Sequence, residues 1–251
     1  MDRPSWYEIK NLGGEEADLF IFNEIGYGGV SAEAFMADLR TVLAGKINLH
    51  LNSPGGDVYQ GIGIYTALKG HPAYVTTYVD ALAASIASVI AMAGDKIIMA
   101  RHSSMMIHEA QHIVIGDADD MRVMAVRLDT TSDQIASIYQ ERVPGSKALT
   151  WRNRMKAETW YTEKQAVAAG LADEVGGKAT AQNSFDLSKY HNVPEAISSE
   201  SEARKHCPDS EDALSEPPAI LEPDPPAPAE EPFDQAAALR QAASLKITEV
   251  I

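Results

Sequence analysis

The first third of the chain alternates between strand patterns and helix patterns, and this alternation constrains the fold more than any other feature. Apolar runs rich in β-branched and aromatic side chains occupy residues 18–22, 47–51 and 74–79, as in buried strands. Between them, apolar residues recur at helical spacing over residues 31–43 and 58–68. Strand and helix in regular succession form βαβ units, in which helices cover a parallel sheet. We therefore expect an α/β protein with a mostly parallel sheet.

The following segment continues the mixed pattern. Residues 85–93 are small and apolar, as in a buried helix, and residues 96–99 and 104–107 have the character of short strands. Residues 119–141 carry apolar and polar residues at helical spacing, which predicts a long amphipathic helix.

The composition changes near residue 180. Residues 181–251 hold 14 acidic against 5 basic residues and nine of the 13 prolines. Proline lacks a backbone N–H and fixes φ, so the run Glu222 to Pro232 is predicted to be extended and disordered. Alanine and leucine return at helical spacing near the end, which predicts a helix over residues 233–249. We expect a folded domain over residues 1–180, followed by a disordered acidic extension.

The net charge of −15 makes nucleic acid and anionic membrane surfaces unfavourable partners. The single cysteine, Cys207, cannot form an intramolecular disulfide, which fits a cytoplasmic protein. No apolar run follows the N-terminal charges as in a secretory signal, and none reaches the ~18 residues that span a bilayer. Neither metal-ligand spacing nor a phosphate-binding loop of the GxxxxGK type is evident, so we expect no metal and no cofactor.

A glycine-rich turn follows the second predicted strand. The run Asn52-Ser53-Pro54-Gly55-Gly56 lies between that strand and a helix, where a parallel sheet presents its carboxyl edge. Glycines at such a turn allow backbone N–H groups to approach a ligand, which suits the stabilisation of an oxyanion. The alternative is a tight turn without a catalytic role.

A serine stands at the next junction of strand and helix. In Ala83-Ala84-Ser85-Ile86-Ala87, small residues flank Ser85 as in a nucleophile elbow, with alanine in place of the usual glycine. The alternative is a serine within a small-residue helix that bonds back to a carbonyl. Ser88 is a competing serine one turn further on, where packing in the apolar helix is the more natural role.

A serine nucleophile needs a base within hydrogen-bond reach. Of the seven histidines, only His102, His108 and His112 lie outside both the tail and the first βαβ units. His108 directly follows the predicted strand SMMI, so its side chain can project over the same sheet edge as Ser85. We therefore interpret Ser85 and His108 as a nucleophile and general base, against the alternative of a structural histidine.

The order of four motifs closely resembles the proteolytic subunits of the Clp protease family. These motifs are SPGG at residues 53–56, AASIA at 83–87, MIHEA at 106–110 and ETWYTEKQAVAAGLAD at 158–173. The resemblance spans about residues 15–178. It implies a repeated βαβ (ββα) superhelix, a fold shared with crotonase-type enzymes. It also implies a serine endopeptidase that needs no cofactor and assembles into homo-oligomeric rings through the long helix.

The resemblance assigns roles to individual positions. It places the nucleophile at Ser85, the histidine at His108 and the oxyanion donors at the backbone N–H groups of Gly56 and Ile86. Glu158 stands where the family has an aspartate, and a longer side chain there requires a shifted backbone. The alternatives are that Asp173 supplies the carboxylate and that Glu158 is a solvated residue.

The same resemblance assigns Ser53, Pro54 and Gly55 to a substrate-binding loop.

The acidic, proline-rich extension and the ETWYT segment look more like the Clp-related head maturation proteases of tailed phages and prophages, which cleave scaffold and capsid proteins. Such an enzyme would act in the host cytoplasm and need no ATP itself. The alternatives are a bacterial Clp-type peptidase with an unfoldase partner, an inactive scaffold or assembly protein, and a crotonase-type acyl-CoA enzyme. A signal peptide peptidase with a Ser and Lys dyad is disfavoured, since the only lysine near the elbow is Lys96 and no membrane anchor is evident.

Overall fold

The computed structural model describes residues 6–11, 15–26, 31–176 and 185–194 of the 251-residue chain. All of them belong to one unit of the chain. The predicted helix over residues 233–249 and the predicted disordered extension beyond residue 194 lie outside the described residues.

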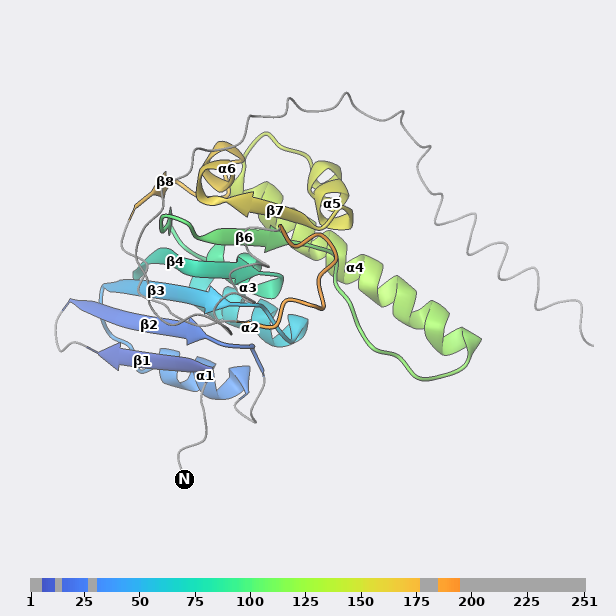
Figure 1. Ribbon diagram of the computed structural model, residues 1–251. Helices are drawn as coiled ribbons and strands as arrows, with labels where there is room; N and C mark the ends of the chain where they lie inside the picture. Colours follow the sequence, from blue (N-terminus) through green and yellow to red (C-terminus); the bar gives the residue numbers. More distant parts are fainter. Residues whose placement is uncertain (1–5, 12–14, 27–30, 177–184, 195–251) are drawn as a thin grey trace, which may run out of the picture. The chain divides into compact units, whose positions relative to one another are not determined.

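Within the described residues, eight strands form one sheet (Figure 1). The strands are β1 (Tyr7–Asn11), β2 (Glu16–Phe22), β3 (Lys46–Ser53), β4 (Tyr74–Ala84), β5 (Lys96–Met99), β6 (Ser104–Ile107), β7 (Thr159–Thr162) and β8 (Glu174–Val175). The helices are α1 (Ala32–Leu39), α2 (Val58–Lys69), α3 (Ile86–Ala91), α4 (Ala118–Arg142), α5 (Ala148–Lys156) and α6 (Glu163–Ala168).

The sheet is mostly parallel. Its main path runs β1-β2-β3-β4-β5-β8, and only the β1–β2 and β6–β7 pairs of the described strands are antiparallel. The α/β class and the mostly parallel sheet predicted from the sequence are therefore confirmed.

Strand β4 divides the sheet. Its first half pairs with β5 from Thr76 to Val79, and its last residues, Leu82 to Ala84, pair with β6. As a result, β3, β4 and β6 are neighbouring parallel strands whose carboxyl ends point to the same edge. The residues that directly follow these three strands are brought together there.

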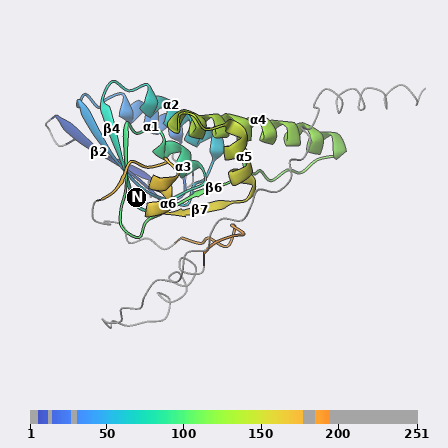
Figure 2. The same ribbon diagram turned by 90° about the horizontal axis from the view of Figure 1, so that it is seen from above.

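The core lies between the sheet and its covering helices. Alternate residues of β2 and β3 are buried, among them Leu19, Ile21, Leu49 and Leu51. Helices α1, α2 and α3 follow one another along the sheet, and α4 packs against α3 and α5 (Figure 2). Burial of these apolar side chains is the main favourable term in folding such a layered structure.

Most predicted elements are present with shifted ends. The helix predicted over residues 31–43 ends at Leu39, and Ser31 caps it as expected by accepting a hydrogen bond from the N–H of Ala34. The strand predicted over residues 74–79 continues to Ala84, because its last residues find β6 as a partner. No helix among the described residues is long and apolar enough to cross a membrane.

Candidate active site

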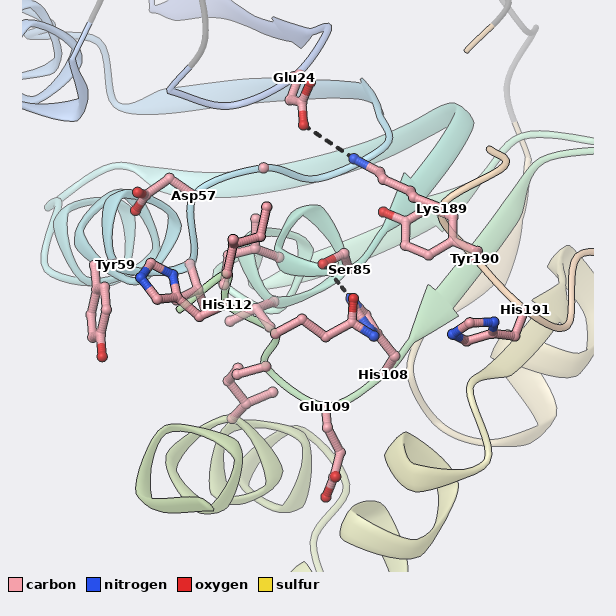
Figure 3. Close-up of a pocket in the computed structure, with 18 of the residues that line it drawn as sticks. Glu24, Asp57, Tyr59, Ser85, His108, Glu109, His112, Lys189, Tyr190 and His191 are labelled. Carbon is pink, nitrogen blue, oxygen red and sulfur yellow. Dashed lines mark hydrogen bonds and ion pairs between the residues drawn. The ribbon is translucent and has the colours of Figure 1, made fainter. Parts of the chain in front are cut away.

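A pocket of about 790 Å³ opens at the edge where β3, β4 and β6 end. Gly56 lies just beyond β3, Ser85 directly follows β4 and His108 directly follows β6, and all three line the pocket together with Ile86. Figure 3 shows Ser85 and His108 in the middle of this pocket, with Tyr59 on one side and Tyr190 and His191 on the other. The structure therefore brings four of the predicted site residues to one place.

Ser85 occupies a strained turn between β4 and α3. Its φ of 56° and ψ of −129° lie outside the regions that residues with side chains commonly adopt. The turn is held because the N–H of Ser85 donates to the carbonyl of Met106 on β6, with an N···O distance of 2.9 Å. Strained backbone of this kind clusters at functional sites, where the surrounding fold maintains it.

The glycine turn packs against the serine turn. Gly55 has a φ of +98°, and a β-carbon there would lie 2.7 Å from the β-carbon of Ser85. Only glycine allows this close approach. Within the described residues, the backbone N–H groups of Gly56 and Ile86 have no hydrogen-bond acceptor, so both are available to a ligand.

His108 is bonded to Ser85 through one ring nitrogen only. Its Nε2 lies 2.7 Å from Ser85 Oγ, whereas its Nδ1 is buried without a partner in the described part of the chain. Burial lowers the pKa of His108 to about 4, with Lys189 and His191 adding to the effect and the charge of Glu158 opposing it. The imidazole is therefore neutral at pH 7 and able to accept a proton.

Glu158 is buried, with 7% of its surface exposed, so it is not a solvated residue. It stands between α5 and β7 with a φ of 47°, a second strained position beside the site. Its carboxylate accepts hydrogen bonds from the backbone N–H groups of His191 at 3.0 Å and Asn192 at 2.6 Å. Burial raises the pKa of Glu158, but these hydrogen bonds outweigh it and lower the pKa below its ordinary value. The carboxylate interacts with His108 through its charge and makes no hydrogen bond to the ring.

The competing residues have other contacts. Asp173 accepts a hydrogen bond from the N–H of Ile97 at 2.6 Å and pairs with Arg142, away from the pocket lining. Ser88 is fully buried, and its hydroxyl bonds to the Tyr139 hydroxyl at 2.7 Å and donates to the carbonyl of Ser85. Ser88 therefore packs, as expected, and supports the turn that carries Ser85.

Ser53, Pro54 and Gly55 do not line the pocket. The Ser53 hydroxyl donates to the carbonyl of Asn23 at 2.6 Å and accepts from the N–H of Gly55 at 3.1 Å, which closes the turn internally. The predicted part of these three residues in substrate binding stays a prediction, and each of them has a structural contact in the turn.

An arginine anchors the residue after His108. The guanidinium of Arg152 on α5 lies 2.7 Å from Glu109 and also pairs with Asp129 and Asp133 of α4. Figure 3 shows Glu109 pointing away from Ser85, toward the helices. The ion pair of Arg152 with Glu109 therefore fixes the backbone beside His108 from the side of the helices.

Residues 185–194 form a wall of the site that the sequence analysis did not identify. Lys189, Tyr190 and His191 all line the pocket, although His191 is assigned to the tail by sequence position. The apolar residues Phe185, Leu187 and Tyr190 stand out in an otherwise polar segment, and this is the one signal that could have indicated packing. No group of three or more His, Cys, Asp or Glu side chains arranged to hold a metal is found among the described residues.

The sequence model of the Clp protease family matches residues 3–179. The chain belongs to the Clp protease family. Among curated proteins, the ATP-dependent Clp protease proteolytic subunit of Bacteroides fragilis is 32% identical over 152 residues, which cover 59% of this chain and 73% of the relative. The corresponding subunit of Deinococcus radiodurans is 31% identical over 134 residues, covering 52% of this chain and 64% of the relative.

This family membership establishes the class of enzyme. A chain of the Clp protease family is a serine-type peptidase, and the prediction of a peptide hydrolase is confirmed. The family match ends at residue 179, so residues 185–194 lie beyond it.

Proposed function

We propose that the chain is a serine endopeptidase in which Ser85 is the nucleophile and His108 the general base. The distance of 2.7 Å between Ser85 Oγ and His108 Nε2 carries this proposal, because proton transfer requires hydrogen-bond contact between nucleophile and base. Burial that keeps the imidazole neutral at pH 7 supports it.

In the proposed reaction, Ser85 Oγ attacks the carbonyl carbon of a peptide bond while His108 Nε2 takes its proton. The N–H groups of Gly56 and Ile86 donate to the oxyanion of the tetrahedral intermediate. His108 then gives the proton to the leaving amine, and the peptide C–N bond breaks to leave an acyl-enzyme. Water attacks the ester with His108 again as base, which releases the acid product and restores Ser85.

Glu158 completes the proposed triad through its charge. The carboxylate is held ionised by backbone N–H donors, and its charge favours the imidazolium that forms when His108 takes a proton. Glutamate in place of aspartate is compatible with this role, because a strained backbone at position 158 accommodates the longer side chain.

Labelling with a fluorophosphonate, followed by peptide mapping, tests the proposal. A single adduct on Ser85 is expected, and both Ser85→Ala and His108→Ala should abolish it. Ser137→Ala changes a partly exposed serine of α4, outside the pocket lining, and should leave the adduct intact. An assembled, folded protein without an adduct would contradict the proposal and favour the inactive scaffold.

We further propose that the substrates are scaffold and capsid proteins of a tailed phage or prophage. The acidic, proline-rich sequence after residue 180 supports this role, because the Clp protease match does not extend over it. The division into a peptidase domain over residues 1–180 and an extension over 181–251 is part of this proposal. Ser85→Ala in the encoding genome should leave scaffold and capsid precursors uncleaved, and normal cleavage would argue against the role.

The bacterial Clp alternative differs in its need for ATP. We expect the purified protein alone to release peptides from unfolded casein. Release that occurs only with an added unfoldase and ATP would favour the alternative, in which the enzyme depends on a partner. Ser85→Ala under the same conditions controls for contaminating peptidases.

Homo-oligomeric assembly is proposed on the family resemblance and on exposed apolar side chains. Ile113 and Ile115 precede α4, and Met121, Val123 and Val126 lie in its first half, and all five are exposed in the isolated chain. This part of α4 extends beyond the sheet in Figure 2. Burial of these side chains against other copies of the chain would stabilise a ring.

A further inference from the structure

Residues 185–194, which we call the wall segment, pack against the strands that carry the site. Tyr190 is 7% exposed and forms an apolar cluster with Leu82 and Ala84 of β4 and Met106 of β6. Four partly buried residues complete this cluster: Trp160, Phe185, Leu187 and Val193. The segment is thus held at the ends of the two strands that position Ser85 and His108.

The ring of Tyr190 stands edge-on to the imidazole. The centroids of the Tyr190 and His108 rings are 5.5 Å apart with an angle of 76° between the planes, a favourable edge-to-face arrangement. Trp160 meets Tyr190 with similar geometry, at 5.9 Å and 76°. The Trp160 ring therefore holds Tyr190 in place, and Tyr190 in turn contacts the His108 ring.

The hydroxyl of Tyr190 reaches the glycine turn. It donates a hydrogen bond to the carbonyl of Pro54, two residues before Gly56. Burial raises the pKa of Tyr190, so the hydroxyl remains protonated and able to donate at physiological pH. One side chain thus contacts both the imidazole and the turn that carries an oxyanion donor.

The neighbours of Tyr190 hold the segment in place. The ammonium of Lys189 lies 3.1 Å from the carboxylate of Glu24, which follows β2. On the other side, the N–H groups of His191 and Asn192 bind the carboxylate of Glu158. These contacts flank Tyr190 in sequence, so the segment is fastened on both sides of it, and Figure 3 shows the pair of Lys189 and Glu24.

We propose that Tyr190 is a positioning residue for peptide hydrolysis at Ser85, its ring fixing the His108 imidazole and its hydroxyl fixing the turn that presents the Gly56 N–H. This inference rests on the proposed function. His108 Nδ1 has no hydrogen-bond partner among the described residues, so no second hydrogen bond fixes the ring orientation. Contact with Tyr190 supplies that restraint from a segment beyond the family match.

Full-length Tyr190→Phe and Tyr190→Ala separate the two contacts. Phenylalanine keeps the ring against His108 and removes only the hydroxyl, which bonds to Pro54 and interacts with Ser85, whereas alanine removes the ring as well. Tyr74→Phe is the matched control, since Tyr74 is an exposed tyrosine at the opposite, amino end of β4. For each protein we would measure the rate of fluorophosphonate labelling at Ser85, and kcat and KM for a peptide substrate, from pH 4 to pH 9.

Tyr190→Phe should lower kcat about tenfold, the effect of losing the hydroxyl, with KM within about twofold of wild type. Tyr190→Ala should lower kcat further. It should also move the acid limb of the pH profile upward, because water would reach His108 and raise its pKa from about 4 toward 6.5. Tyr190→Phe should leave that limb in place. The charged or titratable groups around His108 that stay unchanged in these variants are Glu109, Glu158, Lys189 and His191.

The outcomes distinguish this inference from the proposed function. Absence of a Ser85 adduct in the wild type would overturn the proposed function. A labelled wild type whose Tyr190→Ala and Tyr190→Phe variants match it in kcat and pH profile would overturn only the role of Tyr190. Equal losses in both variants without a shift of the acid limb would also overturn it, because the ring would then not govern His108.

Discussion

Gly61 of α2 faces Ile86, the first residue of α3, so closely that a β-carbon at position 61 would lie 2.1 Å from Ile86 Cγ1. Ile86 carries one of the two N–H groups that we propose to bind the oxyanion. The spacing between these two helices is therefore tied to the position of that N–H group.

Gly61→Ala adds only one methyl group, but it should displace Ile86 and lower both the stability of the protein and its reactivity at Ser85. Overpacking of this kind costs about 1–3 kcal/mol of the free energy of unfolding, and labelling at Ser85 should fall with it. Gly63→Ala in the same helix is the control, since a β-carbon there meets no atom within 4 Å. It should be neutral or stabilising by up to about 1 kcal/mol in thermal denaturation. Equal effects of the two changes would contradict the steric argument.

The pH dependence of labelling should reflect the lowered pKa of His108. With a pKa of about 4, the imidazole remains an available base well below pH 6.5, so labelling at Ser85 should persist at pH 5.5 and fall only near pH 4. A midpoint near 6.5 would show that His108 is not buried as described.

Protein stability should respond to the same group. The pKa of His108 is lower in the folded state than in the unfolded state, so the unfolded state takes up the proton first as the pH falls. The stabilisation from neutral His108 is complete above about pH 6.5 and is lost between about pH 6.5 and 4. Urea denaturation at pH 7 and pH 4.5 should therefore show a larger loss for the wild type than for His108→Gln. Parallel losses would contradict the linkage.

Glu158→Gln should weaken both the site and the wall segment. The glutamine amide group would bring its own N–H donors toward those of His191 and Asn192, and the negative charge near His108 would be lost. We expect about 1–3 kcal/mol of destabilisation and at least tenfold slower labelling. Glu158→Asp keeps the charge, so its stability and labelling rate should lie between those of the wild type and of Glu158→Gln. Glu33→Gln changes an exposed glutamate of α1 and should alter neither measurement.

Arg152→Ala should loosen the backbone beside His108. The Arg152 side chain is only 10% exposed and bonds to three carboxylates, so its removal should destabilise the fold by about 2–4 kcal/mol in urea denaturation. Arg122→Ala removes a partner of Asp119 that is 72% exposed, and the expected cost is under about 1 kcal/mol. A loss of less than about 1 kcal/mol for Arg152→Ala would mean that the ion pairs of this arginine do not stabilise the fold.

Ile115→Asp should prevent assembly without unfolding the chain. Ile115 is 97% exposed in the isolated chain, so a charge there costs nothing in the monomer but opposes burial between copies. Sedimentation should show smaller species than for the wild type. Leu43→Asp, at an apolar residue that is 92% exposed and precedes β3, serves as the control. Unchanged sedimentation of Ile115→Asp would exclude this loop from the interface.

The sequence predicts the central sheet well because its signals are local. Strands β5 and β6 have the predicted bounds, and α4 differs from its predicted range by one residue at each end. The same reasoning predicts Gly56, Ser85 and His108 at one edge, since parallel strands end together, and the structure places them there.

The environment of Glu158 could not be predicted in this way. Its partners, the N–H groups of His191 and Asn192, are more than 30 residues away, and backbone donors leave no trace in the side-chain pattern. Tyr190 was missed for a related reason. Its contacts with His108 and Pro54 depend on where the wall segment packs against the sheet. No hydrophobic periodicity in the sequence predicts that packing.

The backbone at Ser85 also limits which nucleophiles this turn can carry. Proteins use the hydroxyl groups of serine and threonine and the thiol of cysteine for covalent catalysis. A β-branched side chain at a φ of 56° is strongly disfavoured, whereas cysteine has the same branching as serine. The backbone at position 85 is therefore compatible with serine or cysteine, which would form an ester or a thioester intermediate. It is not compatible with threonine.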